Sequence, residues 1–234
     1  MRFDRPLREG RLIRRYQRFL ADVELDDGGD VTAHTPNTGS MLGCCTPGSR
    51  VWLRDSGNPA RKYRYGWELV EAAPQVLVGV NTSMANQLVQ EAIDLGVIAE
   101  LQGYPAIRRE QRYGSENSRV DLLLERGAER CYVEVKNVTL AEAGTALFPD
   151  AVSARASKHL RELTAVAQQG QRAAILFCVQ RGDVERLRPA DRIDPVYGRS
   201  LREAVAAGVL ALAYRARIDP AEIRLETALP VELR

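Results

Sequence analysis

Two neighbouring apolar runs near the middle of the chain contain charged residues at positions where strand packing favours valine. They lie in RVDLLLERGAERCYVEVKNVTL, residues 119–140, and the charged residues are Asp121, Glu134 and Lys136. Successive side chains of a strand point to opposite faces, so Glu134 and Lys136 share one face of the second run. The short connection at Gly127 predicts an antiparallel hairpin, which brings Asp121 close to Glu134.

Two carboxylates and a lysine in this arrangement are suited to holding a divalent cation. Two close carboxylates repel each other unless a cation lies between them, and Mg²⁺ or Mn²⁺ prefers oxygen ligands. A bound metal lowers the pKa of a water molecule and polarises a phosphoryl oxygen, while Lys136 can orient the nucleophile or stabilise developing charge. The pattern therefore predicts a metal site at Asp121 and Glu134 that is equipped for phosphodiester hydrolysis. A ladder of salt bridges between strands explains the same residues without a metal.

Strand and helix patterns alternate from residue 83 to the end of the chain. Apolar residues at helical spacing predict helices over 83–95, 151–168 and 199–207. Strands are expected at 106–113, 119–125, 131–138, 173–180 and 208–217. The long helix is expected to bury Val152, Ala156, Leu160, Leu163 and Ala167 and to expose Arg155, Lys158, His159 and Glu162. This alternation predicts a mixed sheet flanked by helices.

The N-terminal third shows strand patterns and no helix pattern. Its five strand candidates are a long first run that ends at Leu25, then VTAHT, RVWLR, KYRYGWELVEA and QVLVGVN. A closed barrel removes the edges that so small a sheet would expose. We therefore expect an OB-like barrel over residues 1–82, followed by an α/β domain over residues 83–234. From the strand count alone, an SH3-like barrel fits nearly as well.

Basic and aromatic residues are interleaved in two segments of this first domain. Residues 1–18 hold seven arginines and two acidic residues (7 − 2 = +5), and residues 50–67 hold five basic residues and one acidic residue (5 − 1 = +4). Cations neutralise phosphates, and bases stack on aromatic rings. We therefore expect DNA contacts from this domain at Arg14, Arg15, Arg18, Arg61, Lys62, Arg64 and Trp67. A solvated basic face over buried aromatic rings explains the same pattern.

Composition limits the remaining classes of function. The chain has 234 residues, 45% of them apolar, so it can bury a core, and its formal net charge of +2 does not by itself identify a nucleic-acid partner. No run reaches the roughly 18 apolar residues of a membrane span, and the N-terminus lacks the apolar region of a secretion signal, so we expect a cytoplasmic protein with no membrane partner. The four cysteines form no CxxC pair, which favours buried free thiols over zinc ligands or disulfides.

The spacing of the site residues, D-x12-E-x-K, resembles the active-site signature of the PD-(D/E)XK nuclease superfamily. That superfamily carries an acidic residue, a (D/E)-x-K triplet and an upstream helical glutamate on a mixed sheet with flanking helices. Glu91, in the first expected helix, matches the position of that glutamate. The resemblance therefore implies a catalytic and metal-binding role for Glu91 beside Asp121, Glu134 and Lys136. The proline of the signature is absent, since Val120 precedes Asp121.

Longer motifs resemble the bacterial sugar fermentation stimulation protein A family, from about residue 5 to about residue 230. They are HTPNTGSM and TPG in the first domain and VEVKNVTL, FPDAV and KHLREL in the second. The resemblance implies an OB-like domain followed by a nuclease-like domain. It also implies a protein that binds DNA with little sequence preference and regulates the use of sugars, especially maltose. Arg155, Lys158 and His159 become candidates for a phosphate-facing surface of the long helix.

Two functions therefore stay open. A DNA-binding protein would use its nuclease-like fold only for binding, whereas a Mg²⁺-dependent nuclease would use the intact set of two acids and a lysine. DNA binding is ranked first because both functions require it. A globular protein whose basic segments only keep it soluble is a third interpretation. A homodimer is one option for the oligomeric state.

Overall fold

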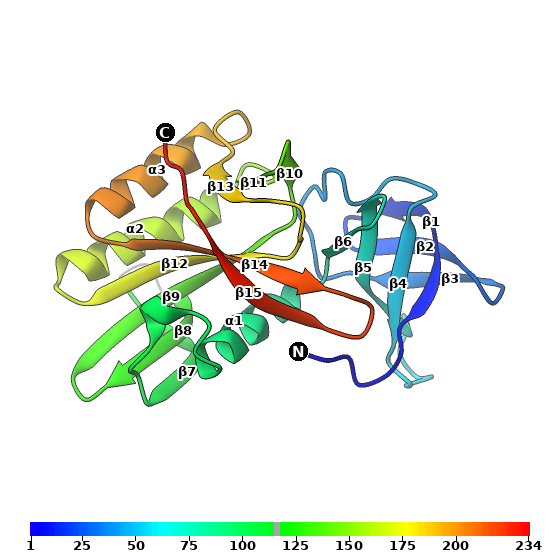
Figure 1. The fold of residues 1–234 in the computed structure, drawn as a ribbon, viewed down its shortest axis with the longest axis horizontal. Helices are drawn as coiled ribbons and strands as arrows, with labels where there is room; N and C mark the ends of the chain where they lie inside the picture. Colours follow the sequence, from blue (N-terminus) through cyan, green and yellow to red (C-terminus); the bar gives the residue numbers. More distant parts are fainter. Residues whose placement is uncertain (115–117) are drawn as a thin grey trace.

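The computed structural model describes residues 1–114 and 118–234. A β-barrel and a larger α/β domain lie side by side (Figure 1). The strands of the first domain are β1 (Arg8–Tyr16), β2 (Leu20–Leu25), β3 (Asp30–His34), β4 (Arg50–Asp55), β5 (Tyr65–Ala73) and β6 (Val76–Gly79). Strands β1 to β5 close into a barrel because β3 pairs with β5 as well as with β2, while β6 extends the sheet beside β5. The predicted five-stranded, OB-like barrel is confirmed.

The long run that the sequence suggests as one first strand is two strands joined by a tight turn. Gln17 and Arg18 have φ angles of 47° and 65°, and the chain reverses there so that β2 pairs antiparallel with β1. Residues other than glycine seldom adopt this left-handed conformation, so the sequence gives no sign of the turn. The expected fifth strand, QVLVGVN, is β6 and takes no part in closing the barrel.

The barrel is filled by an apolar core. Leu12, Val51 and Leu53 point inward from β1 and β4, and Trp67 points inward from β5. Trp67 is fully buried, and its Nε1 donates to the carbonyl oxygen of Leu69 at 2.9 Å. A fully buried indole cannot stack on a base. The structure therefore contradicts the predicted DNA contact of Trp67.

A six-stranded mixed sheet forms the centre of the second domain, in the order β15-β14-β12-β9-β8-β7. Its strands are β7 (Ala106–Tyr113), β8 (Ser118–Arg126), β9 (Glu129–Val138), β12 (Arg172–Val179), β14 (Leu210–Ile218) and β15 (Ile223–Leu229). Strands β9, β12 and β14 run parallel, and antiparallel strands flank them on both sides. The predicted mixed sheet is confirmed, with β15 as an unpredicted edge strand.

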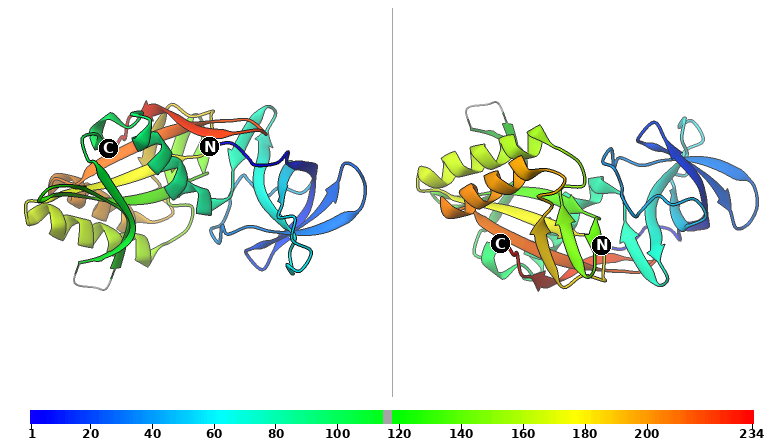
Figure 2. Two further views of the ribbon diagram at one scale, coloured as in Figure 1. Left: turned by 90° about the horizontal axis from the view of Figure 1, so that it is seen from below. Right: turned by 90° about the horizontal axis from the view of Figure 1, so that it is seen from above.

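Three helices cover this sheet. α1 (Ala85–Asp94), preceded by the short 3-10 helix η1 (Thr82–Met84), lies on one face, and α2 (Ala154–Gln168) and α3 (Pro195–Ala206) lie on the other (Figures 1 and 2). An apolar cluster on each face holds the layers together. Strand β12 is a nearly continuous apolar run because both of its faces are covered. A second 3-10 helix, η2 (Ala99–Leu101), follows α1.

The long helix α2 begins later than the apolar pattern suggests. Ser153 is its N-cap, and the Ser153 side chain accepts a hydrogen bond from the backbone nitrogen of Ala156 at 3.1 Å. Val152 therefore lies outside the helix and is 77% exposed, contrary to its predicted place in the buried stripe.

A small three-stranded sheet stands beside the main one. It consists of β10 (Ala141–Glu142), β11 (Thr145–Phe148) and β13 (Arg186–Pro189). The sequence did not predict these strands, since runs of two to four residues are too short for a period to be visible.

The described residues include no helix that is long and apolar enough to cross a membrane. The four cysteines are free, and three of them, Cys44, Cys131 and Cys178, are buried, which agrees with the expectation of buried thiols. Burial raises the pKa of Cys131 to about 11 and that of Cys178 to about 12, so both remain protonated at neutral pH.

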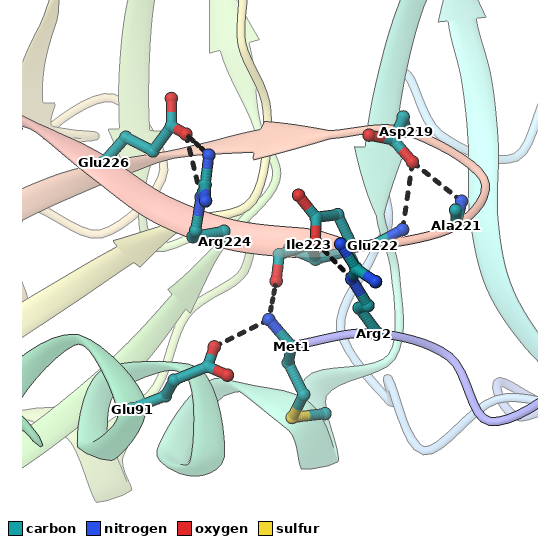
Figure 3. A network of polar contacts seen from close by, with 9 residues as sticks. All are labelled: Met1, Arg2, Glu91, Asp219, Ala221, Glu222, Ile223, Arg224 and Glu226. Atoms are coloured by element: carbon teal, nitrogen blue, oxygen red, sulfur yellow. Dashed lines mark hydrogen bonds and ion pairs between the residues drawn. The ribbon is translucent and has the colours of Figure 1, made fainter. Parts of the chain in front are cut away.

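The N-terminal residues pack against the second domain rather than against the barrel. The backbone nitrogen of Phe3 donates to the carbonyl of Ala221 at 2.9 Å, and the backbone nitrogen of Ile223 donates to the carbonyl of Met1 at 3.0 Å. Figure 3 shows Met1 and Arg2 beside Ile223 and the turn that precedes it. This segment ties the start of the barrel to β15.

The loop after β3 makes a second connection between the domains. The Ser40 hydroxyl donates to the carbonyl of Asp150 at 2.7 Å, and the backbone nitrogen of Met41 donates to Asp150 Oδ2 at 3.0 Å. Gly39 allows this close approach, because a Cβ at that position would lie 2.7 Å from the same carboxylate oxygen. The motifs HTPNTGSM and FPDAV therefore meet at the domain junction.

Candidate metal and nucleic-acid site

Strand β9 carries Glu134 and Lys136 on the face of the sheet that α2 covers. Alternation sends Val133 and Val135 into the apolar cluster beneath α1 and leaves the two charged side chains on the opposite face. Glu134 is 2% exposed, and Lys136 Nζ donates to Glu134 Oε1 at 2.7 Å. The two side chains are neighbours, as the period of two predicts.

Asp121 reaches this cluster because β8 and β9 separate at its position. The ladder between the two strands runs as far as the Leu122–Val133 pair. Beyond that pair, Asp121 Oδ2 accepts a hydrogen bond from the backbone nitrogen of Val135 at 2.7 Å. Asn86 of α1 donates from its Nδ2 to Asp121 Oδ1 at 2.9 Å. The orientation of the Asp121 carboxylate is thus fixed by two groups. They are the Val135 backbone, at the fork where β8 and β9 separate, and Asn86 of α1.

A histidine from α2 completes the contacts of Glu134. His159 Nδ1 contacts Glu134 Oε1, the same oxygen that binds Lys136. Glu134 Oε2 is also buried, and no residue in the described parts of the chain gives it a hydrogen bond. One carboxylate oxygen is therefore held by two side chains, while the other is left for a group that the described residues do not supply.

Burial and nearby charges shift the pKa values of the two carboxylates in opposite directions. Burial raises the pKa of Glu134, but the hydrogen bond from His159 and the charge of Lys136 outweigh it, so this pKa ends below its usual value. Burial raises the pKa of Asp121, and the negative charge of Glu134 raises it further. Asp121 and Glu134 are therefore close enough to repel each other. A cation between them would relieve that repulsion.

Two tyrosine hydroxyls near Glu134 also lack a hydrogen-bond partner within the described parts of the chain. Tyr113, at the end of β7, and Tyr197, in α3, are both buried. Burial raises the pKa of each phenol, and the charge of Glu134 adds to both shifts. Unpaired buried polar groups mark places where water or an ion belongs. Sequence reasoning missed both residues, because Tyr113 and Tyr197 lie outside the charged motif of residues 119–140.

Glu91 contacts the N-terminal residue Met1 (Figure 3). Its Oε2 accepts a hydrogen bond from the amine nitrogen of Met1 at 2.6 Å. Glu91 follows Asn86 by five positions, which corresponds to about 140° around an α-helix. Only Asn86 therefore faces Asp121, and the structure contradicts the predicted role of Glu91 in the site. The sequence offered one signal for Asn86. It is a polar residue with a short amide side chain, and it lies next to the apolar residues that α1 buries at helical spacing.

The carboxylate donors fit a hard divalent cation. Within residues 1–114 and 118–234, no three His, Cys, Asp or Glu side chains converge as a complete metal centre. Mg²⁺, however, usually keeps several waters and takes one or two carboxylates together with phosphate oxygens. Here Glu134 Oε2 has no hydrogen-bond partner in the described parts of the chain, and Asp121 is close enough to repel Glu134. The site therefore offers the two carboxylates that such an ion needs. Asp121 and Glu134 are the residues that would hold Mg²⁺ or Mn²⁺.

The residues proposed for the surface of α2 are split between solvent and the site. His159 is 6% exposed and contacts Glu134, so the prediction that it lies on the helix surface is wrong. Glu162, expected on the same exposed side, is also buried. Arg155 is exposed, and its Nε lies 3.5 Å from His159 Nε2. Lys158 is half-buried. Arg155 therefore borders the buried cluster on its solvent side.

Three of the predicted DNA contacts on the barrel are already bound within the chain. Arg14 Nε donates to Asp22 Oδ2 at 2.8 Å, and Arg64 Nε donates to Asp55 Oδ1 at 2.7 Å. Arg15 is half-buried and donates to two carbonyl oxygens of the loop after β3, at 2.9 and 3.0 Å. Arg15 therefore supports that loop, and the charges of Arg14 and Arg64 are partly compensated.

Arg18, Arg61 and Lys62 differ from those three, since they are exposed and have no acidic partner in the described parts of the chain. Arg18 lies in the turn between β1 and β2, and the other two lie in the loop between β4 and β5. Both connections border His34, because the ring centroids of Phe19 and His34 are 5.9 Å apart and Arg61 lines a pocket together with His34. The three cations therefore flank one face of the barrel.

An OB barrel followed by a restriction-endonuclease-like sheet defines the class of this protein. The model of the SfsA N-terminal OB domain matches residues 13–80, and the model of the sugar fermentation stimulation protein RE domain matches residues 83–222. The chain belongs to the sugar fermentation stimulation protein (SfsA) family. This membership agrees with the family resemblance of its motifs.

Relatives match along the whole chain. A sugar fermentation stimulation protein homolog of Thioalkalivibrio sulfidiphilus is 60% identical and covers 100% of this chain and 98% of its own. A homolog of Geobacter sulfurreducens is 64% identical, with 97% of each chain covered. The solved structure of Pyrococcus furiosus SfsA in complex with Ca²⁺ has a TM-score of 0.90 and 29% identity, with 99% of this chain and 98% of that chain covered.

Proposed function

We propose that the protein binds DNA with little sequence preference, mainly through phosphate contacts of its barrel. The observation that carries this proposal is the position of Arg18, Arg61 and Lys62, three exposed cations that flank one face of an OB fold. OB folds bind oligonucleotides across this face and its flanking loops. Contacts to phosphates position a protein on DNA without reading the bases. Such binding would also serve a regulatory factor of sugar use, the role suggested by the names of the relatives.

Replacing the three cations together with alanine tests this proposal. The triple variant should bind several unrelated DNA sequences more weakly by the same factor, and the salt dependence of its binding should be shallower, since about 0.9 of a counterion is released per phosphate contact. The matched control replaces Arg8, Arg11 and Arg50, which removes the same formal charge. Arg8 and Arg50 are paired with Asp27 and Glu9, respectively. Equal losses in both triple variants would contradict a defined binding face.

Metal-dependent hydrolysis of DNA is a second candidate function, and the unpartnered Oε2 of Glu134 favours it. A bound divalent ion would activate water and polarise a phosphoryl oxygen. Asp121 and Glu134 would hold that ion, and Lys136, fixed by Glu134 at 2.7 Å, would stabilise negative charge that develops on the phosphate. The solved P. furiosus relative in complex with Ca²⁺, another cation that binds oxygen ligands, supports a cation site in this fold.

Incubation of the purified protein with linear, supercoiled and single-stranded DNA tests hydrolysis directly. Cleavage is expected with Mg²⁺ or Mn²⁺ and not with chelator. Lys136→Ala should lose cleavage and still bind Mn²⁺, because Lys136 is not among the expected ligands. Intact DNA in both metals, from wild-type protein that binds Mn²⁺, would leave DNA binding as the function and remove the nuclease candidate.

A further inference from the structure

A pocket of about 350 Å³ on the outside of the barrel takes no part in the carboxylate site. Three neighbouring strands form its floor, where Gly66 of β5 pairs with His34 of β3 and with Arg54 of β4. Because glycine has no side chain, a gap opens between the His34 imidazole and the Arg54 guanidinium, which both line the pocket. Ligand sites commonly measure about 300–1,000 Å³, so this gap is large enough for one small planar group.

A buried carboxylate holds the guanidinium of Arg54 in the pocket wall. Glu68 follows Gly66 on the same face of β5 and is fully buried. Its Oε1 accepts a hydrogen bond from Arg54 Nε at 2.9 Å, and its Oε2 accepts one from Asn81 Nδ2 at 2.7 Å. The Arg54 side chain is nevertheless 48% exposed. Arg54 therefore presents a planar, oriented group to the pocket at little further entropic cost.

Aromatic and basic groups continue outward from this gap. The ring of Phe19 lies 5.9 Å from that of His34, and Phe19 is 38% exposed. Arg61 lines the pocket from the β4–β5 loop and has no acidic partner in the described parts of the chain. Asp55 also lines the pocket, but it is bound by Arg64. The pocket thus combines planar stacking surfaces with a cation that is available for a phosphate.

We propose that this pocket binds one unpaired nucleotide of a single DNA strand, with the base between His34 and Arg54 and its phosphate at Arg61. In a duplex the faces of the bases are covered by neighbouring bases, so only an unpaired base can enter such a gap. The proposal rests on the proposed DNA-binding function and names the form of DNA that the barrel accepts. It also assigns a reason for glycine at position 66, where a side chain would fill the gap.

Gly66→Val tests the pocket by filling it. A Cβ at this position would meet only Glu68 Oε1, at 3.4 Å, which is a contact that the barrel accepts, and valine suits a strand. Binding of one labelled oligonucleotide, as a single strand and as a duplex, is measured by fluorescence anisotropy. The variant should bind the single strand about tenfold more weakly and the duplex as the wild type does. Arg61→Ala should also weaken single-strand binding, whereas Arg11→Ala, an exposed arginine outside the pocket, should have a smaller effect.

The outcomes separate this proposal from the one on which it rests. Wild-type protein that binds neither form of DNA would refute both. Wild-type protein that binds DNA, together with a folded Gly66→Val variant of unchanged single-strand affinity, would refute the pocket alone. If Gly66→Val does not fold, equal affinities of Arg61→Ala and Arg11→Ala refute the pocket. Competition by a free mononucleotide as strong as that by the oligonucleotide would assign the pocket to free nucleotides and overturn the single-strand assignment.

Discussion

Asp121→Asn should stabilise the metal-free protein and remove its response to Mn²⁺. Burial and the charge of Glu134 raise the pKa of Asp121 in the folded protein, so the ionised carboxylate destabilises the fold at neutral pH. Each pKa unit of such a shift corresponds to about 1.4 kcal/mol. In a chain of this size, about 1 kcal/mol changes Tm by about 2–4 °C. Asparagine can still accept the hydrogen bond from the Val135 backbone nitrogen, so the fork between β8 and β9 is kept.

The pH dependence of this difference follows from the sign of the shift. Because the pKa of Asp121 is raised on folding, the wild-type protein gains stability as pH falls through that raised pKa, and the variant does not. In chelator, the higher Tm of the variant should therefore be clearest at neutral pH and should shrink on acidification. With Mn²⁺ at about 100 times its Kd, the wild-type protein should gain about 2.7 kcal/mol of stability, and the variant far less.

Differential scanning calorimetry in chelator and in Mn²⁺ measures both effects. Glu203→Gln, which removes the same charge from an exposed position on α3, is the control and should behave as the wild type does in both conditions. An Asp121→Asn variant with an unchanged or lower Tm in chelator would refute the repulsion between Asp121 and Glu134. A variant that kept the full Mn²⁺ response would show that Asp121 is not a ligand.

Two further changes probe the fold that positions the site. Gly10→Ala should lower the stability of the barrel in urea unfolding by about 1–3 kcal/mol. The added Cβ would lie 2.4 Å from the backbone oxygen of Glu24, so the β1–β2 ladder would have to shift. Unchanged stability would show that the ladder is less rigid than its contacts indicate. Asp150→Ala should weaken the docking of the two domains by about 1–3 kcal/mol, because the backbone nitrogen of Met41 loses its acceptor while Ser40 keeps only the backbone carbonyl of residue 150. Limited proteolysis should then cut the domain junction faster, and an unchanged rate would contradict that role of Asp150.

Most of the fold could be predicted from local patterns. The strand-and-helix alternation after residue 83 is a short-range signal, and so is the nearly continuous apolar run of β12, which is buried on both faces. The features that escaped prediction have no local signal. The reversal at Gln17 and Arg18 uses left-handed backbone without glycine. The start of α2 depends on the Ser153 cap rather than on apolar periodicity, which is why Val152 seemed to belong to the helix.

The candidate site divides in the same way. The adjacency of Glu134 and Lys136 follows from the period of a strand, and one hairpin suffices to bring Asp121 near them. Contacts between a helix and the sheet that it covers cannot be predicted from the periodicity of single elements. Which side of α1 faces the sheet decides between Asn86 and Glu91, and the packing of α2 turns His159 inward. Sequence periodicity describes one element at a time, so it cannot determine the relative rotation of two elements.

DNA binding through phosphates is the central claim, and the salt dependence of binding tests it most directly. The wild-type protein is titrated onto several unrelated DNA sequences between low and moderate salt. The logarithm of the binding constant should fall linearly with the logarithm of the salt concentration, by about 0.9 for each phosphate neutralised on duplex DNA, and with one slope for all sequences. Affinity that does not change with salt, or strong binding to one sequence only, would contradict the claim.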